Sequence, residues 1–175
     1  MSDQGRKELF DNSPFMTAWE KVIDGHRFTY VRAGNSVGVI PIRRNTSINA
    51  IEIMLIQEPR LETSTPMLKA VGGYLHGRPQ EEMAHHLLLE EAGIACEKLH
   101  LLVPRMEGFT VIELPIATYL ALDWHRVTTD ITACIQFMTL AEGVELVLAQ
   151  RIPDQCTADA IMRLALLEAR NRLPI

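Results

Sequence analysis

The sequence predicts an α+β fold in which a mixed β-sheet lies between helices and follows an N-terminal antiparallel β-hairpin unit. First, an Asp24-Gly25 turn separates two strand-like runs near the N-terminus. Second, several β-rich runs separated by short turns occur throughout the chain. Third, two segments without a helix breaker, residues 80–92 and about 157–172, carry apolar residues at helical spacing. Strands mixed with a few helices in this way are typical of an α+β domain.

The first half of the chain predicts two hairpins. The Asp24-Gly25 turn joins residues 16–23 to residues 26–33, because a type I′ turn needs positive φ at both of its central positions. Residues 37–42 and 51–57 are expected to pair as a second hairpin. The run at 51–57 becomes apolar on both faces, which favours a central strand that is covered on both sides.

A loop is expected at residues 58–67, which contain two prolines, and a short strand at 68–71 is expected to end at Gly72-Gly73. The next helix is placed at 80–92 by the proline before it and the glycine after it. The remaining expected elements are strands at 99–106, 112–122 and 132–139, a short helix at 140–150 interrupted by glycine, and a final helix capped by Thr157.

Length and composition agree with one main domain. The chain has 175 residues, of which 47% are hydrophobic and 22% are charged, and its net charge is -5. Division into an N-terminal hairpin unit, residues 1–35, and a main domain, residues 36–175, is expected. The acidic balance argues against nucleic-acid binding, which needs a basic surface. No apolar run is long enough to cross a membrane, and three widely spaced cysteines indicate reduced thiols, so a cytoplasmic protein is expected.

The segment 72–94 carries the most informative motif. A glycine-rich loop opens the 80–92 helix, which ends in a Glu-Glu pair followed by a glycine. This resembles the Nudix box, G-x5-E-x7-R-E-U-x-E-E-x-G-U, in which U is a bulky apolar residue. Gly72 takes the first position, Glu90 and Glu91 form the acidic pair, and Gly93 is the closing glycine. The resemblance implies a Nudix fold and a loop–helix–loop that holds divalent cations against a diphosphate.

Three positions depart from that pattern. Arg78 stands where the first glutamate belongs, His86 replaces the arginine, and Leu87 replaces the next glutamate. A glutamate at 87 would share a helix face with Glu91, because the two are four residues apart. Leucine supplies neither a charge nor an oxygen ligand, so the usual arrangement of several metal ions is weakened.

The remaining ligands for Mg²⁺ or Mn²⁺ are expected to be Glu90 and Glu91, with the Val71 carbonyl as a backbone ligand that the resemblance implies. A substitute site is a further hypothesis, because Glu82, His86 and Glu90 recur every four residues along one helix stripe. Two carboxylates and an imidazole suit Mn²⁺ or Zn²⁺. The alternative is an ordinary solvated helix face.

The N-terminal hairpin, the strand at 37–42, residues 68–73 at the junction with the box and the segment 107–113 resemble the ADP-ribose pyrophosphatase branch of the family. There a later loop carries a glutamate that acts as base or metal partner, which implies Glu113 or Glu107 here. Other residues are expected to contact the substrate. Gly72, Gly73 and Arg78 lie in the box, Arg105 offers a cation to an anionic substrate, and Trp19 offers an aromatic face to an adenine; packing and surface roles are the alternatives.

Three functional hypotheses follow. The first is a Nudix-type hydrolase that uses a divalent metal to cleave the diphosphate of a nucleoside diphosphate-linked compound, such as ADP-ribose or an ADP-sugar. The second is an impaired protein of the same fold that binds a nucleotide-like ligand without cleaving it. The third is an oligomerisation role, because unpaired hairpin edges favour a partner strand; the resemblance implies a homodimer.

Overall fold

The computed structural model describes residues 6–13, 15–60, 63–104, 112–113 and 115–175. Its elements, in chain order, are β1 (Arg6–Asn12), β2 (Met16–Ile23), β3 (His26–Ala33), β4 (Ser36–Asn45), β5 (Ala50–Arg60), β6 (Thr63–Lys69), β7 (Val71–Tyr74), α1 (Gln80–Ala92), β8 (Ile94–Val103), β9 (Ile112–Glu113), β10 (Ile116–Arg126), β11 (Cys134–Thr139), α2 (Leu140–Leu148) and α3 (Gln155–Ala169).

The strands of the described residues form two sheets. The larger has seven strands, with the order β11-β5-β4-β10-β8; β6 also pairs with β5, and β7 also pairs with β4. Strands β4 and β10 run parallel, whereas β10 and β8 run antiparallel, so the sheet is mixed as predicted. The smaller sheet has the order β1-β2-β3-β9.

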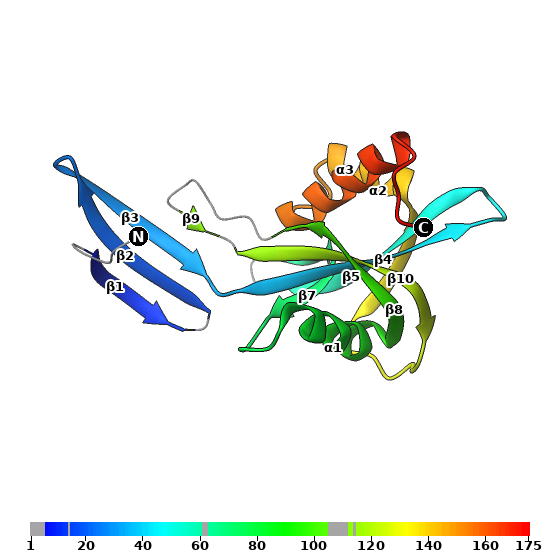
Figure 1. Ribbon diagram of the computed structural model, residues 1–175, viewed down its shortest axis with the longest axis horizontal. Coiled ribbons are helices and arrows are strands. Elements are labelled where there is room, and N and C mark those ends of the chain that lie inside the picture. Colours follow the sequence, from blue (N-terminus) through cyan, green and yellow to red (C-terminus); the bar gives the residue numbers. More distant parts are fainter. Residues whose placement is uncertain (1–5, 14, 61–62, 105–111, 114) are drawn as a thin grey trace.

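Helices cover both faces of the larger sheet, α1 on one side and α2 with α3 on the other (Figure 1). Each face has its own core. Met83, Ala84, Leu87 and Leu88 of α1 pack on one face of the sheet. Ile161 and Leu164 of α3 belong to the core on the opposite face. The predicted α+β sandwich is therefore confirmed.

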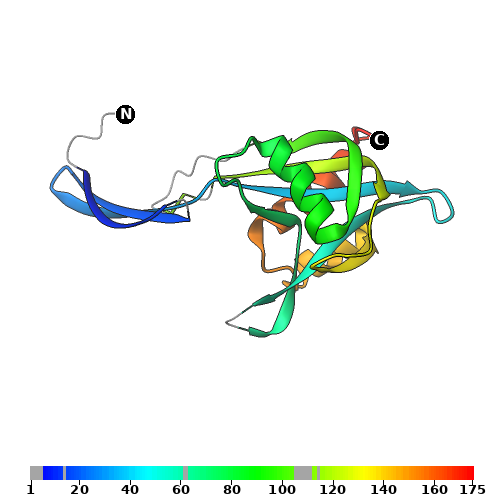
Figure 2. The ribbon, with the colours of Figure 1, turned by 90° about the horizontal axis from the view of Figure 1, so that it is seen from below.

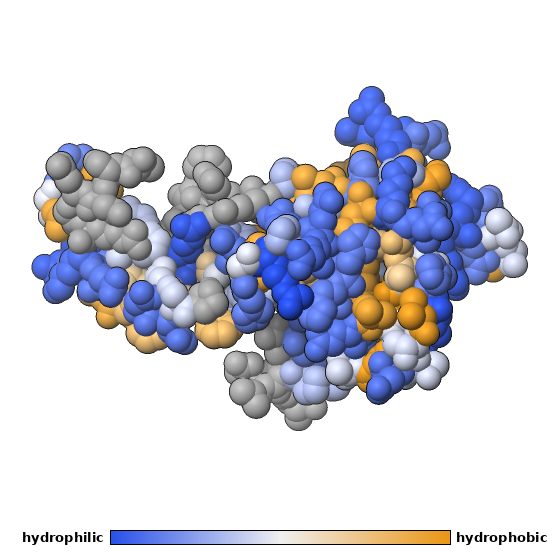
Figure 3. Space-filling view, turned by 60° about the horizontal axis from the view of Figure 1, so that its bottom comes forward, coloured by the Kyte–Doolittle hydropathy of each residue, from blue (hydrophilic) through white to orange (hydrophobic). Residues whose placement is uncertain are grey.

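The N-terminal sheet projects from the end of the larger sheet as a separate lobe, which is plain in the rotated view of Figure 2. Its β2–β3 hairpin has the predicted bounds, and Asp24 and Gly25 both adopt positive φ, 50° and 80°. The sequence prediction did not include β1, which pairs with β2. On the face shown in Figure 3, the centre is mainly hydrophilic, and hydrophobic residues gather at the edge of this lobe and on the main body.

The prediction of a loop at residues 58–67 is wrong. Strand β5 continues to Arg60 and pairs with β6, with a register shift between Glu58 and Arg60. Pro59 lies at this shift, where a bulge removes the need for its missing N–H. Pro66 lies in β6, which pairs only with β5 among the described strands, so one of its backbone edges is free of ladder bonds.

Other element bounds also differ from expectation. Gly72 and Gly73 do not end a strand but lie within β7, paired with β4. Helix α2 continues through Gly143 without interruption. Gly143 is buried, and a Cβ atom there would stand 2.8 Å from the Ile53 side chain, so close packing favours glycine at this position. Helix α3 is capped by Asp154 rather than by Thr157. Strand β8 begins at Ile94, directly after α1, and the strand expected at 112–122 divides into β9 and β10.

Candidate functional site

The box segment folds as a strand, a turn and a helix. In β7, Gly72 lies so close to β4 that a Cβ atom would stand 2.5 Å from the Val37 carbonyl oxygen. Only glycine fits there without moving one of the strands. A turn at His76 and Gly77, both with positive φ, leads into α1, which begins at Gln80 as predicted. This geometry brings the backbone of Gly72 and Gly73 against the C-terminal half of α1, since a Cβ on Gly73 would contact Leu87 at 3.3 Å.

The stripe of Glu82, His86 and Glu90 lies on the exposed side of α1. His86 Nε2 is 3.2 Å from Glu90 Oε2, and both side chains are about half exposed. Glu82 forms no ion pair with any residue that the structure describes. Among the residues that the structure describes, no three His, Cys, Asp or Glu side chains are grouped closely enough to hold a metal ion. The Glu90 carboxylate is instead paired with His86, one turn earlier on the exposed face of α1.

Glu91 has a different environment from that of its neighbour Glu90. The Glu91 side chain is half-buried, and the Gly72 N–H donates a hydrogen bond to it. Burial raises the pKa of the Glu91 carboxyl above its ordinary value, and the Glu58 and Glu90 carboxylates raise it further. The Lys69 ammonium and the Gly72 N–H oppose this increase. The second oxygen, Oε2, is buried and accepts no hydrogen bond from the described part of the chain.

Lys69 and Glu58 complete this environment, and sequence reasoning assigned a role to neither. Lys69 Nζ is 3.1 Å from Glu58 Oε2 and 3.4 Å from the Gly72 carbonyl oxygen. The β5–β6 register pairs Ile56 with Lys69, so Glu58 and Lys69 are diagonal neighbours on one face of the sheet. The sequence signal that could have indicated this pair is Lys69, three residues before the first box glycine. Its partner Glu58 lies in the segment that was predicted to be a loop, so the pairing could not be inferred.

A cleft of about 410 Å³ opens beside these residues. Glu58, Lys69, Gly72 and Gly73 are part of its lining, and Asp154 contributes a further carboxylate from the N-terminus of α3. Asp154 is fixed there because its Oδ1 accepts hydrogen bonds from the Thr157 N–H and hydroxyl, at 2.8 and 2.5 Å. Two carboxylates, Glu58 and Glu91, therefore interact with the one lysine, and Asp154 lines the same cleft. An excess of negative charge in a partly enclosed cleft favours a cation.

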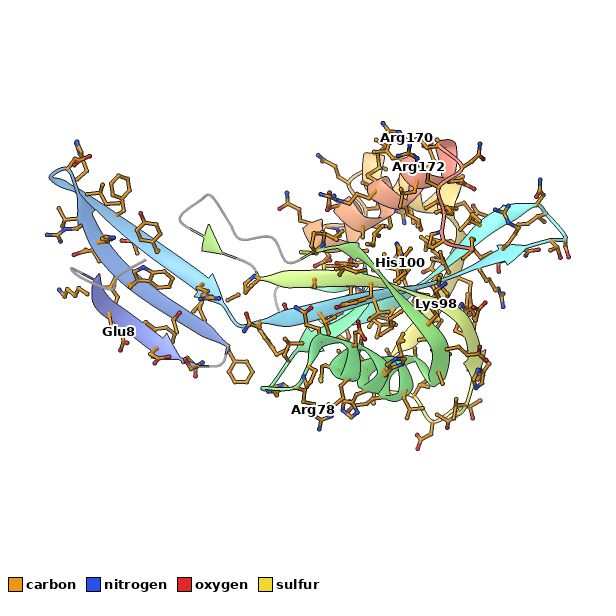
Figure 4. All side chains as sticks on the ribbon, viewed as in Figure 1. Glu8, Arg78, Lys98, His100, Arg170 and Arg172 are labelled. Carbon is orange, nitrogen blue, oxygen red and sulfur yellow. The ribbon has the colours of Figure 1, made fainter. Side chains whose placement is uncertain are left out.

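A second cleft, of about 490 Å³, lies between the N-terminal lobe and the box turn. Arg32, His76 and Arg78 line it, together with the hydroxyl groups of Ser13 and Thr17. Arg78 is exposed at the start of α1, where Figure 4 shows its side chain on the outside of the turn. Both clefts reach Ala33, so a basic cleft adjoins an acidic one.

The Phe15 ring links the N-terminal lobe to this turn. It makes edge contacts with Tyr74 at 5.2 Å and with His76 at 5.9 Å between ring centroids. Such contacts hold the two walls of the second cleft together.

The other predicted site residues are placed as follows. Leu87 is buried, with 5% of its surface exposed, in the core beneath Gly73. The Val71 side chain is fully buried. Trp19 stacks on Tyr30 at 5.9 Å within the N-terminal sheet and does not belong to the lining of either cleft. Arg105 and Glu107 lie outside the described residues. The backbone of Glu113 pairs with Arg32 in the parallel β3–β9 ladder.

The oxygen atoms around Glu91 are suitable ligands for one hard divalent cation. The buried Oε2 atom has a free acceptor site, and the Glu58 carboxylate and the Gly72 carbonyl are oxygens of the kind that Mg²⁺ and Mn²⁺ prefer. The lysine that now contacts two of these oxygens is the exception, because an ammonium and a metal ion repel each other. The residues therefore suit one weakly held divalent cation better than a cluster of several.

Comparison with known proteins identifies the fold. No family model matches the chain, and no curated protein sequence matches it. A solved structure described as an ADP compounds hydrolase is similar, with a TM-score of 0.71 and 18% sequence identity. The match covers 99% of this chain and 100% of that one. The chain has the Nudix fold, shared along its whole length with this hydrolase. No described helix is long and apolar enough to cross a membrane.

Proposed function

We propose that this protein hydrolyses the diphosphate of a nucleoside diphosphate-linked compound, with ADP-ribose or an ADP-sugar as the favoured substrate class. The observation that carries the proposal is the half-buried Glu91 side chain, whose buried Oε2 atom has no hydrogen-bond partner among the described residues, beside a cleft lined by Glu58 and Gly72. The fold that the chain shares with an ADP compounds hydrolase adds only a fold-level analogy to this proposal, and the site carries the argument.

Each cleft has its own part in this proposal. A divalent cation bound at Glu91 would neutralise the diphosphate and lower the pKa of the attacking water. Glu58 lines the acidic cleft, and the Gly72 N–H, from the same lining, donates a hydrogen bond to the Glu91 carboxylate. Arg78 and His76 line the adjoining basic cleft, where they would contact phosphate oxygens or the group linked through the diphosphate. Glu113 or Glu107 remains the proposed base.

The proposed assay incubates the purified protein with ADP-ribose and several ADP-sugars in the presence of Mg²⁺ or Mn²⁺, with EDTA as the control. We expect metal-dependent release of AMP, detected by chromatography. No turnover of any of these compounds with either metal would refute the hydrolase proposal.

A second candidate is a protein that binds the same ligands without cleaving them. Buried Leu87, in place of a carboxylate, and the lysine at the acidic cleft favour it. Calorimetry distinguishes the two candidates, because ADP-ribose binding in EDTA, together with no AMP release in Mn²⁺, supports the binding protein.

The same proposal includes a homodimer formed through the N-terminal lobe. The large apolar side chains that are exposed on the described part of this lobe include Leu9, Phe10, Val22, Ile23 and Phe28. A second copy covering them would remove apolar surface from water. Light scattering tests this part, and a monomer at micromolar concentration contradicts it.

A further inference from the structure

The Lys69 side chain lies in an unusual position for a surface-strand lysine. Only 15% of it is exposed, and its ammonium lies within 3.1 Å of the Glu58 carboxylate and 3.4 Å of the Gly72 carbonyl. Lysine normally keeps its strongly hydrated ammonium in water. Here the ammonium instead lies among the oxygens that line the acidic cleft.

Two carboxylates interact with this one ammonium. Glu58 and Glu91 both interact with the one positive charge of Lys69, and Asp154 lines the same cleft. The Glu91 Oε2 atom is buried and has no hydrogen-bond donor in the described residues. A buried carboxylate oxygen without a partner is costly, so a second positive charge beside Glu91 Oε2 would be favourable.

We propose that Lys69 is a built-in counter-ion of the acidic cleft and that a divalent cation must displace its ammonium in order to bind. The two compete for the Glu58 carboxylate and the Gly72 carbonyl, both of which Lys69 contacts. The flexible four-carbon stem allows the ammonium to leave without moving the strand. A displaced ammonium stays tethered near the cleft, where it meets anionic ligands such as phosphate. This inference deepens the proposed function, because it concerns the cleft where that hydrolysis would occur.

The test measures Mn²⁺ binding by calorimetry and by the paramagnetic resonance signal of free Mn²⁺, with no substrate present. Lys69→Met removes the competing charge and keeps most of the side-chain volume. Lys98→Met is the matched control, because Lys98 is exposed on β8 (Figure 4). We expect Lys69→Met to bind Mn²⁺ about tenfold more tightly or better than wild type, and Lys98→Met to equal wild type.

Thermal unfolding gives a second readout. Without divalent ions, Lys69→Met removes the Lys69 charge from Glu58 and Glu91, so it should melt below wild type and gain more from Mn²⁺. If Lys69→Met does not fold, Lys69→Gln keeps hydrogen-bond donors without the charge and should show the same increase in affinity. Equal Mn²⁺ affinities of the Lys69 variants and wild type, or no binding by any of them, overturn the inference.

Turnover separates this inference from the proposed function. Tight Mn²⁺ binding by Lys69→Met without AMP release by any form of the protein supports the counter-ion role and refutes hydrolysis. Metal-dependent AMP release by wild type with unchanged affinity in Lys69→Met supports hydrolysis and refutes the counter-ion role.

Discussion

Replacement of Leu87 by glutamate is the most informative single change to the candidate site. The new carboxylate would start one helical turn before Glu91 and beneath Gly73, at the place where the Nudix pattern has an acid. The leucine is 5% exposed, so the variant both removes an apolar side chain from the core and brings a charge into it.

The expected destabilisation follows from these two effects. Loss of a buried leucine side chain costs about 2 kcal/mol. A buried carboxylate without a counter-ion costs roughly another 2 kcal/mol, because Glu91 next to it is also negative. We therefore expect the free energy of unfolding of Leu87→Glu to be about 4 kcal/mol below that of wild type in EDTA, a large share of the total for a domain.

Urea denaturation in EDTA and in Mn²⁺ measures this effect. Leu89→Glu is the matched control, because Leu89 is 44% exposed on the outer side of the same helix. We expect the control to stay within about 0.5 kcal/mol of wild type in both buffers. For Leu87→Glu, Mn²⁺ at a hundred times its Kd should restore about 2.7 kcal/mol. The reasoning is refuted if Leu87→Glu costs no more than Leu89→Glu, or if Mn²⁺ stabilises it no more than wild type.

Three further predictions concern the surroundings of the site. Gly72→Ala should lose about 3 kcal/mol of stability in urea unfolding, because its Cβ would meet the Val37 carbonyl oxygen at 2.5 Å; unchanged stability would contradict the close β4–β7 approach. Thr157→Val should cost about 2 kcal/mol by the same measurement, because the buried Thr157 hydroxyl accepts the Ala70 N–H at 2.8 Å; a neutral effect would show that water replaces it. Burial, assisted by the nearby Asp154 and Asp159 charges, raises the pKa of the Cys156 thiol to about 11. At pH 8 iodoacetamide should therefore modify Cys156 roughly a hundredfold more slowly in the folded protein than in urea, as followed by mass spectrometry, and equal rates would contradict this environment.

The parts of the fold that were predictable from sequence are those fixed by local chemistry. Asp24-Gly25 gave the correct hairpin because both residues tolerate positive φ. Helix α1 has the predicted bounds because Pro79 precedes it and Gly93, with φ of 64°, ends it. These signals act within a few residues, so no tertiary contact was needed to interpret them.

The β5–β6 pairing could not be predicted in the same way. Prolines at 59 and 66 indicated a loop, but the structure places the first at a register shift and the second in a strand with one unpaired edge. Proline is compatible with both positions, and only the pairing of the two strands distinguishes them from a loop.

The candidate site was predictable only in part for the same reason. Glu91 was found because it belongs to a local motif, and its half-burial agrees with a role in a site. Its adjacent residue Glu90 lies on the exposed face, since successive residues on a helix point about 100° apart. Glu58 and Lys69 were missed because only the cross-strand register brings them to Gly72.

The most direct test of the account is the position of Mn²⁺ in a crystal soaked with the ion and measured at its absorption edge. The account predicts an anomalous peak bounded by Glu91, Glu58 and the Gly72 carbonyl, with the Lys69 side chain moved away from it. A peak only at Glu82, His86 and Glu90, or no peak on the protein at millimolar Mn²⁺, would contradict it.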